Sequence, residues 1–177
     1  MKTYRTITCA AIVTAAVCAG LAATLAAQAP VAQAPVAPAP KKPSIAGNYI
    51  LESRDLADGK TVRPPEVMGM LTLTADRRNF NVYWQENGQP ASIHAISTYT
   101  LSDKEFTEDN VFYLANFDGN GASYDTQPST GKAPVTIKGD AISMKLPLHN
   151  EPDVVFTPTG MTATVQGEFV DHWKKID

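Results

Sequence analysis

The chain has 177 residues, of which 44% are hydrophobic and 19% are charged, and its formal net charge is −3. This composition is typical of a globular protein and excludes a collagen, a coiled coil, a polytopic membrane protein and a disulfide scaffold. The negative charge argues against nucleic acid or an anionic membrane surface as the main partner.

The N-terminus has the layout of a secretory signal peptide. Two basic residues, Lys2 and Arg5, precede an uncharged, alanine-rich apolar stretch over residues 7–27, which is the order that such leaders follow. The stretch ends in small residues rather than in basic stop-transfer residues. We therefore expect cleavage after Ala26, export to the periplasm or the medium of a bacterium, and no stable membrane insertion afterwards.

The cysteines and the segment after the leader limit what the mature chain can do. Both cysteines, Cys9 and Cys18, lie in the leader, so the mature chain has no thiol for a disulfide, for catalysis or for a metal. Residues 27–40 read AQAPVAQAPVAPAP, and alternating Ala and Pro favours an extended, disordered spacer. The predicted organisation is a signal peptide over 1–26, an Ala/Pro-rich linker over 27–43 and one domain over 44–177.

Apolar and polar residues alternate with a period of two throughout residues 44–177. This pattern is typical of strands with one buried face. The residues predicted to point inward are Tyr49, Leu51 and Ser53, then Leu71 and Leu73, then Phe80, Val82 and Trp84, then Ile142, Met144, Leu146 and Leu148, and finally Met161, Ala163 and Val165.

Turn signals separate these runs at short intervals. They fall at Asp58-Gly59, residues 75–78, Asn87-Gly88, residues 118–121, Gly139-Asp140 and Thr159-Gly160. Regular short strands without helical interludes predict an all-β fold, an up-and-down antiparallel β-barrel of about 8–10 strands. Residues 102–105 also fit a helix capping box, but we expect a hairpin turn there because residues 99–101 and 111–117 read as strands on either side.

The start and the end of the domain resemble the bacterial lipocalin-like domain family. That family typically begins Gly-x-Trp-x-Leu and continues into an Asp-Gly turn, a Pro pair and a Gly-x-Leu-Thr strand. The matching segments here are residues 47–51, Asp58-Gly59, Pro64-Pro65 and residues 69–72, and residues 169–175 resemble the family's last strand. Tyr49 stands where Trp is usual. The resemblance implies a lipocalin-like or calycin-like barrel with a cavity, and it implies no reaction.

Three residues are predicted to form the floor of this barrel. An up-and-down barrel has no free edge only if its first and last strands pair. Gly47 lacks a Cβ and would let the first strand pass close to the closing strand. Tyr49 and Trp173 would then fill one end of the barrel, with Trp173 on the same face as Phe169.

No catalytic residue, metal site or cofactor is predicted. His94, His149 and His172 are far apart in sequence and lie in different elements, which disfavours a shared zinc site. Residues 118–125 resemble a calcium loop only in part, because Ala122 and Ser123 replace a ligand and a glycine. Asp171 and His172 point to opposite faces of a strand and cannot act as a pair. The acidic segment 103–109 is expected to be a solvated loop.

Trp84, Tyr99, Met144 and Phe156 are the predicted lumen residues, suited to a small apolar ligand or to a packed core, with the core slightly favoured for any single one of them. The leading hypothesis is thus an exported barrel that binds or sequesters a small apolar molecule. One alternative is a periplasmic protease inhibitor built on an eight-stranded barrel. The first-strand sequence at residues 46–51 and the flexible N-terminal segment favour this alternative, and the lack of a disulfide argues against it. The other is a barrel isomerase or hydratase without an identified site. The sequence predicts neither the ligand nor the oligomeric state.

Overall fold

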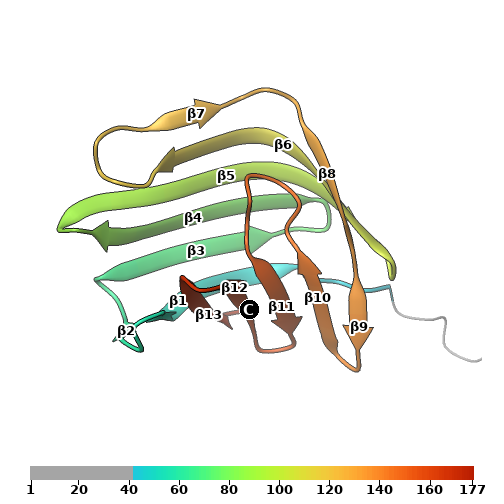
Figure 1. Ribbon diagram of the computed structural model, residues 1–177. Helices are drawn as coiled ribbons and strands as arrows, with labels where there is room; N and C mark the ends of the chain where they lie inside the picture. Colours follow the sequence, from blue (N-terminus) through green and yellow to red (C-terminus); the bar gives the residue numbers. More distant parts are fainter. Residues whose placement is uncertain (1–41) are drawn as a thin grey trace, which may run out of the picture. The chain divides into compact units, whose positions relative to one another are not determined.

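The computed structural model describes residues 42–177 (Figure 1). The predicted signal peptide and most of the predicted linker lie outside the described residues. Within the described range every residue in regular structure is in a strand, bridge or turn, and all strand pairs are antiparallel. The predicted all-β antiparallel fold class is therefore confirmed. The described part of the chain contains no helix that could cross a lipid bilayer.

Thirteen strands make up the sheet within residues 42–177. The first seven are β1 (Gly47–Leu56), β2 (Thr61–Val62), β3 (Val67–Leu73), β4 (Arg77–Glu86), β5 (Gln89–Leu101), β6 (Glu105–Asn116) and β7 (Ser123–Asp125). The others are β8 (Thr130–Pro134), β9 (Thr136–Lys138), β10 (Ala141–Lys145), β11 (Asp153–Thr157), β12 (Gly160–Val165) and β13 (Phe169–Lys175). The count exceeds the predicted 8–10 because β2, β7 and β9 are strands of only two or three residues.

The strands follow one another as a rolled meander, in the spatial order β7-β6-β5-β4-β3-β1-β13-β12-β11-β10-β9 (Figure 1). The first and last long strands pair from Tyr49 opposite Lys175 to Leu56 opposite Phe169, with Leu51 opposite Trp173. The pairing of first and last strands that the sequence predicted is thus present. Residues 130–138 run between the two ends of this path, pairing with β6 through β8 and with β10 through β9.

The two ends of the rolled sheet carry different turns. The β3–β4, β5–β6 and β11–β12 hairpins lie at one end, together with the start of β1 and the end of β13. The β4–β5 and β12–β13 connections lie at the other end, whereas the β10–β11 connection reaches Arg78, next to the β3–β4 hairpin. We call these two ends the floor end and the mouth end.

Aromatic residues fill the floor end. Tyr49 is 1% exposed and packs edge-on against Phe156, with ring centroids 5.8 Å apart. Trp173 is 3% exposed and lies 5.7 Å from the ring of Phe80. A Cβ built on Gly69 of β3 would lie only 2.5 Å from the Trp173 indole. Glycine at this position therefore makes room for the indole.

Gly47 permits a second close approach at the start of β1. Its φ is +153°, and a Cβ there would collide with the side chain of Lys175 on β13. The Lys175 ammonium in turn donates to the carbonyl of Ala46, at 2.6 Å. The first and last strands are thus in contact at the residue where the sequence predicted it.

Two β-bulges change which residues face the interior. One lies in β1, where the register with β13 shifts between Leu51 and Ser53. The other lies in the β5–β6 pair, where the register shifts next to Ile96. A bulge adds one residue to one strand and so reverses the inward and outward positions beyond it. Arg54, opposite Asp171, is consequently turned inward and buried, whereas Ser53, predicted to point inward, shares the outer face with His172.

Two expectations about charged segments are wrong. The turn predicted over 75–78 is shorter, because Arg77 and Arg78 already belong to β4 and Arg78 is 5% exposed. The acidic segment 103–109 is not a solvated loop, because β6 begins at Glu105 and Glu108 is 1% exposed. The hairpin turn predicted between residues 101 and 105 is present, and Ser102 bonds the backbone of Glu105 across it.

We predict that Trp173→Ala lowers the free energy of unfolding by about 3–5 kcal/mol, the usual range for emptying a buried aromatic site. The indole would leave a void against Gly69 and Phe80 at the β1–β13 seam. Urea unfolding followed by circular dichroism measures the loss. Phe117→Ala is the control, because this ring is 57% exposed and its removal should change stability by less than about 0.5 kcal/mol. Equal effects of the two substitutions would contradict the role of Trp173.

Candidate functional site

A cavity of about 1150 Å³ lies inside the rolled sheet. Its wall reaches from Trp173 and Phe156 on the floor side to Asn87 and Glu168 in the β4–β5 and β12–β13 connections at the mouth end. The cavity therefore runs along the interior and ends among the mouth turns. Its middle section is apolar, lined by Leu71, Leu73, Phe80, Val82, Met161 and Ala163.

The predicted lumen residues divide into two pairs. Trp84 and Phe156 line the cavity, whereas Tyr99 and Met144 do not, although both are buried. Tyr99 packs against Phe106 at 5.5 Å, and its hydroxyl donates to the carbonyl of Thr74 in the β3–β4 turn, at 2.5 Å. It belongs to the packed floor.

The predicted floor residues are also divided. Trp173 lines the cavity, whereas Gly47 and Tyr49 lie outside its lining. The Tyr49 hydroxyl donates to the carbonyl of Ile45 at 2.9 Å. Burial, with the charge of Asp177 as a smaller cause, raises the pKa of Tyr49 to about 12. This phenol stays neutral and serves packing rather than ligand contact.

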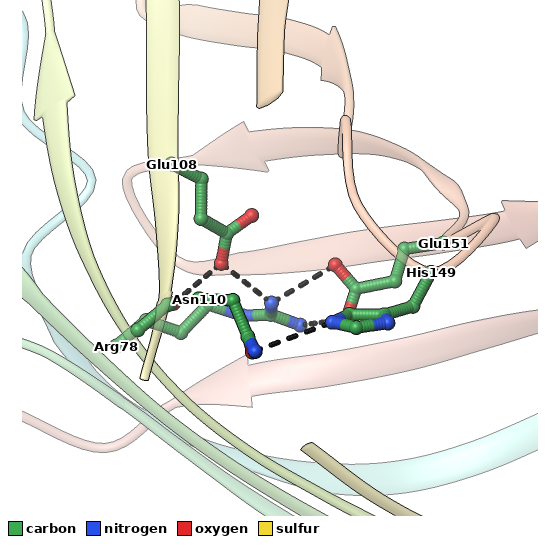
Figure 2. Close-up of polar contacts among 6 residues, drawn as sticks. Arg78, Glu108, Asn110, His149 and Glu151 are labelled. Carbon is green, nitrogen blue, oxygen red and sulfur yellow. Dashed lines mark hydrogen bonds and ion pairs between the residues drawn. The ribbon is translucent and has the colours of Figure 1, made fainter. Parts of the chain in front are cut away.

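One wall of the cavity carries a buried ionic cluster, shown in Figure 2. The Arg78 guanidinium on β4 donates to Glu108 of β6 at 2.8 Å and makes two bonds to Glu151, at 2.8 and 2.9 Å. Ser97 donates to the same Glu108 oxygen, at 2.5 Å. The other Glu108 oxygen is buried and has no hydrogen-bond partner. One guanidinium thus balances two carboxylates away from water.

This cluster also holds the β10–β11 connection, residues 146–152, against the interior. Glu151 belongs to this connection, and His149 beside it stacks on Tyr113 with the ring centroids 3.9 Å apart. The His149 ring also contacts Asn110, at 3.4 Å (Figure 2). His149 and Asn150 both have positive φ angles near 50°, which are uncommon for residues with a Cβ. Tertiary contacts, Glu151 to Arg78 above all, keep the connection in this conformation.

A second ionic pair lies nearer the mouth. Arg54 of β1 donates two hydrogen bonds to Asp171 of β13, at 2.6 and 2.9 Å. Its guanidinium also lies 3.9 Å from the ring of Phe169 and 5.4 Å from that of Trp84. The β-bulge in β1 explains this inward position, since simple alternation after Tyr49, Leu51 and Ser53 would place Arg54 outside.

Burial sets the protonation behaviour of these carboxyl groups. Desolvation raises the pKa of Glu151, and the nearby Glu108 charge adds to the rise while Arg78 opposes it. Desolvation likewise raises the pKa of Asp171 against the opposing effect of Arg54. Burial also raises the pKa of Tyr113, next to the cluster, to about 12. Desolvation thus opposes the charged form of each of these three groups.

The three histidines have separate surroundings. The His94 ring contacts Asn81 at 2.9 Å, and the outward-facing His172 contacts Asp55 at 2.8 Å. His149 lies at the cluster described above. Over residues 42–177 no group of three side chains is placed to hold a metal ion. Asp171 and His172 point to opposite faces, as the sequence predicted, and so cannot exchange a proton with each other.

Sequence reasoning missed the buried charged residues that line the cavity, namely Arg54, Arg78, Glu151 and Asp171. Alternation assigns an inward position to Asp171, since it shares a face with Phe169 and Trp173, and this signal could have shown a charge in the interior. Arg54 and Arg78 gave no such signal. A bulge determines the orientation of Arg54, and Arg78 follows a turn whose end the sequence places too late.

Comparison with known proteins gives no assignment: no family model, no curated protein and no solved structure matches this chain.

We predict that Arg54→Leu lowers the free energy of unfolding by about 3–5 kcal/mol, because it leaves the Asp171 carboxylate buried without a partner. The double variant Arg54→Leu/Asp171→Leu should recover most of this loss, since it removes both charges. Urea unfolding of the wild type, both single variants and the double variant completes the cycle. Additive losses in the double variant would contradict a buried, mutually dependent pair.

The raised pKa of Glu151 predicts a distinct pH dependence. The folded state binds a proton at Glu151 at a higher pH than the unfolded state does. This difference stabilises the folded state fully below the ordinary pKa of a glutamate, and the stabilisation is lost as the pH rises through the raised pKa of the folded state. The stability of the wild type relative to Glu151→Gln should therefore increase as pH falls from 7 to 5. Urea unfolding at both pH values measures it. A flat difference, or one with the opposite sign, would contradict the effect of burial on this carboxyl.

Proposed function

We propose that this protein is an exported lipocalin-like binding module that holds a small, largely apolar molecule in its lumen. The observation that carries the proposal is the cavity of about 1150 Å³ with apolar middle walls and access among the mouth turns. Small-molecule sites are concave, mostly apolar and equipped with a few polar groups. The two ionic groups, at Arg54 and Arg78, supply those polar groups here.

The size of the cavity distinguishes it from ordinary packing. Protein interiors are packed about as densely as organic crystals, and voids larger than a water molecule are few. Side chains that face a large void lose the dispersion contacts that a neighbour would provide. An apolar molecule in the lumen would restore those contacts along Leu71, Phe80, Val82 and Ala163, and this gain would favour binding.

The lipocalin-like assignment and the export of the chain belong to the same proposal. The resemblance covers residues 47–51 and 69–72, and each of these segments begins with a glycine. The packing of the strands explains why glycine is needed at both positions. Gly47 lies against Lys175, and Gly69 lies against Trp173. Both glycines thus lie where β1 and β3 approach the closing strand β13. An exported carrier without cysteines in its mature part would rely on such packing for its stability.

Intrinsic fluorescence offers a direct test, because the chain has two tryptophans and both Trp84 and Trp173 line the cavity. We expect a neutral apolar dye such as N-phenyl-1-naphthylamine to bind with a stoichiometry of one and to quench the tryptophan emission by energy transfer. Isothermal titration calorimetry gives the stoichiometry independently. Absence of saturable binding for this dye and for neutral alkyl ligands would overturn the proposal.

Filling the lumen should weaken that binding. Ala163 of β12 lines the cavity, and Ala163→Trp should weaken dye binding by about tenfold, equivalent to about 1.4 kcal/mol. Thr162→Trp is the matched control, because residue 162 is the adjacent position on the same strand and faces outward from the lumen. The measurement is the dye titration above, with circular dichroism to check that both variants are folded. Equal weakening by both variants would place the dye outside the lumen.

A further inference from the structure

The charges around the lumen carry an inference about the ligand's polar end, and it rests on the proposed binding function. We infer that the lumen selects amphiphiles with a positively charged head, such as an alkylammonium or arylammonium, over those with a carboxylate or sulfate head. Selection of this kind needs a net negative potential in the cavity. It also requires that the cationic side chains in the lining already have carboxylate partners.

The residues that line the cavity have a surplus of negative charge. Three are cationic, namely Arg54, Lys60 and Arg78, and six are acidic, namely Glu66, Glu86, Asp118, Glu151, Glu168 and Asp171. Of the acidic residues, Glu151 and Asp171 are buried and bonded to Arg78 and Arg54, and the other four are exposed, so that the surplus lies among the exposed groups. Charges within a cleft that has low-dielectric walls produce a stronger potential than the same charges on an open surface. A cationic head would therefore gain energy on entering, and an anionic head would lose it.

Neither of the two buried lining cations, Arg54 and Arg78, is free for an anion. Arg78 is bonded to Glu108 and Glu151, and Arg54 is bonded twice to Asp171. Lys60 lies 3.5 Å from Glu66, but both side chains are exposed to water. A carboxylate ligand that bound Arg54 or Arg78 would have to displace Asp171 or Glu151 and leave a buried carboxylate without a partner, which is costly.

The buried cluster contributes its own surplus. Arg78 is shared by two carboxylates, and one Glu108 oxygen has no hydrogen-bond partner although the side chain is 1% exposed. This surplus lies away from water, where a charge acts more strongly than at the surface. A cation in the adjoining lumen would offset it without breaking any bond of the cluster.

The mouth combines aromatic rings with acidic side chains. Trp84 and Phe117 lie 6.5 Å apart, and the Trp84 ring nitrogen donates to Glu86 at 3.2 Å. Asp118 follows Phe117 directly. Aromatic faces attract cations, quaternary ammonium groups included. The Arg54 guanidinium on the Phe169 ring shows that the mouth aromatics hold a cation in this fold.

Three ligands with the same alkyl chain separate charge from apolar binding. They are dodecyltrimethylammonium, dodecanol and dodecanoate, each titrated below its critical micelle concentration at pH 7.5 with tryptophan fluorescence as the readout. We expect the ammonium to bind at least about fivefold more tightly than the carboxylate, as one net charge acting over roughly 10 Å would produce. The difference should shrink in 0.5 M salt.

Charge-neutralising variants locate the effect. Glu151→Gln removes a negative charge from the buried cluster and keeps the shape of the side chain. Glu86→Gln removes a negative charge from the mouth and leaves the buried cluster intact. Each should reduce the ratio of ammonium to carboxylate affinity by at least about twofold. Glu52→Gln is the matched control, because it removes the same charge from an exposed position on β1 outside the cavity lining. It should leave the ratio unchanged.

The outcomes separate this inference from the proposed function. Equal affinity for the three ligands, or tighter binding of the carboxylate, would overturn the charge selection while lumen binding stands. Loss of the preference in Glu52→Gln to the same extent as in Glu151→Gln and Glu86→Gln would also overturn it, since the effect would then be one of overall charge. No binding of any of the three would remove the proposed function and this inference together.

Discussion

The pairing of β1 with β13 is the constraint on which the rest of the structure depends. It joins the first and last long strands of the meander, so that two sheet edges satisfy each other's backbone groups instead of facing water. Gly47 and Gly69 allow the close approach, and Trp173 fills the seam between β13 and β3. Once this seam forms, the inward faces of β3, β4, β12 and β13 surround a common interior. The cavity follows from that geometry, because side chains such as Ala163 and Val82 are too small to fill it.

Buried charge is the second constraint, and it limits how the chain around the cavity can be arranged. Isolated charges in an apolar interior are costly, so each guanidinium must have its carboxylate in place. Arg54 and Asp171 belong to paired neighbouring strands, so the pairing of β1 with β13 brings them together. Arg78 instead depends on Glu151 from the β10–β11 connection and on Glu108 from β6. The second cluster thus ties a connection to the sheet wall, and it can form only after distant parts of the chain have come together.

Much of the fold could be predicted from the sequence, because alternation and turn chemistry are local. The inward faces of Tyr49 and Leu51, the Asn87-Gly88 hairpin and the pairing of the end strands all follow from such signals. The charged residues that line the cavity could not be predicted in this way, because the alternation of apolar and polar residues gives no sign of a β-bulge. A single extra residue near Glu52 turns Arg54 inward, and the pairing of Arg78 depends on residues 30 and 73 positions away. Local patterns contain no information on such partners.

One side chain that contributes to the charge of the lumen also holds the β10–β11 connection in place. Glu151 provides part of the negative surplus, and its bonds to Arg78 keep residues 146–152 in a conformation with two positive φ angles. A conformation of this kind persists only where surrounding contacts enforce it. Protonation of Glu151 would weaken its bonds to Arg78 and reduce the negative field in one step. The affinity for a charged ligand and the position of the β10–β11 connection are therefore not independent properties of this fold, because one carboxylate contributes to both.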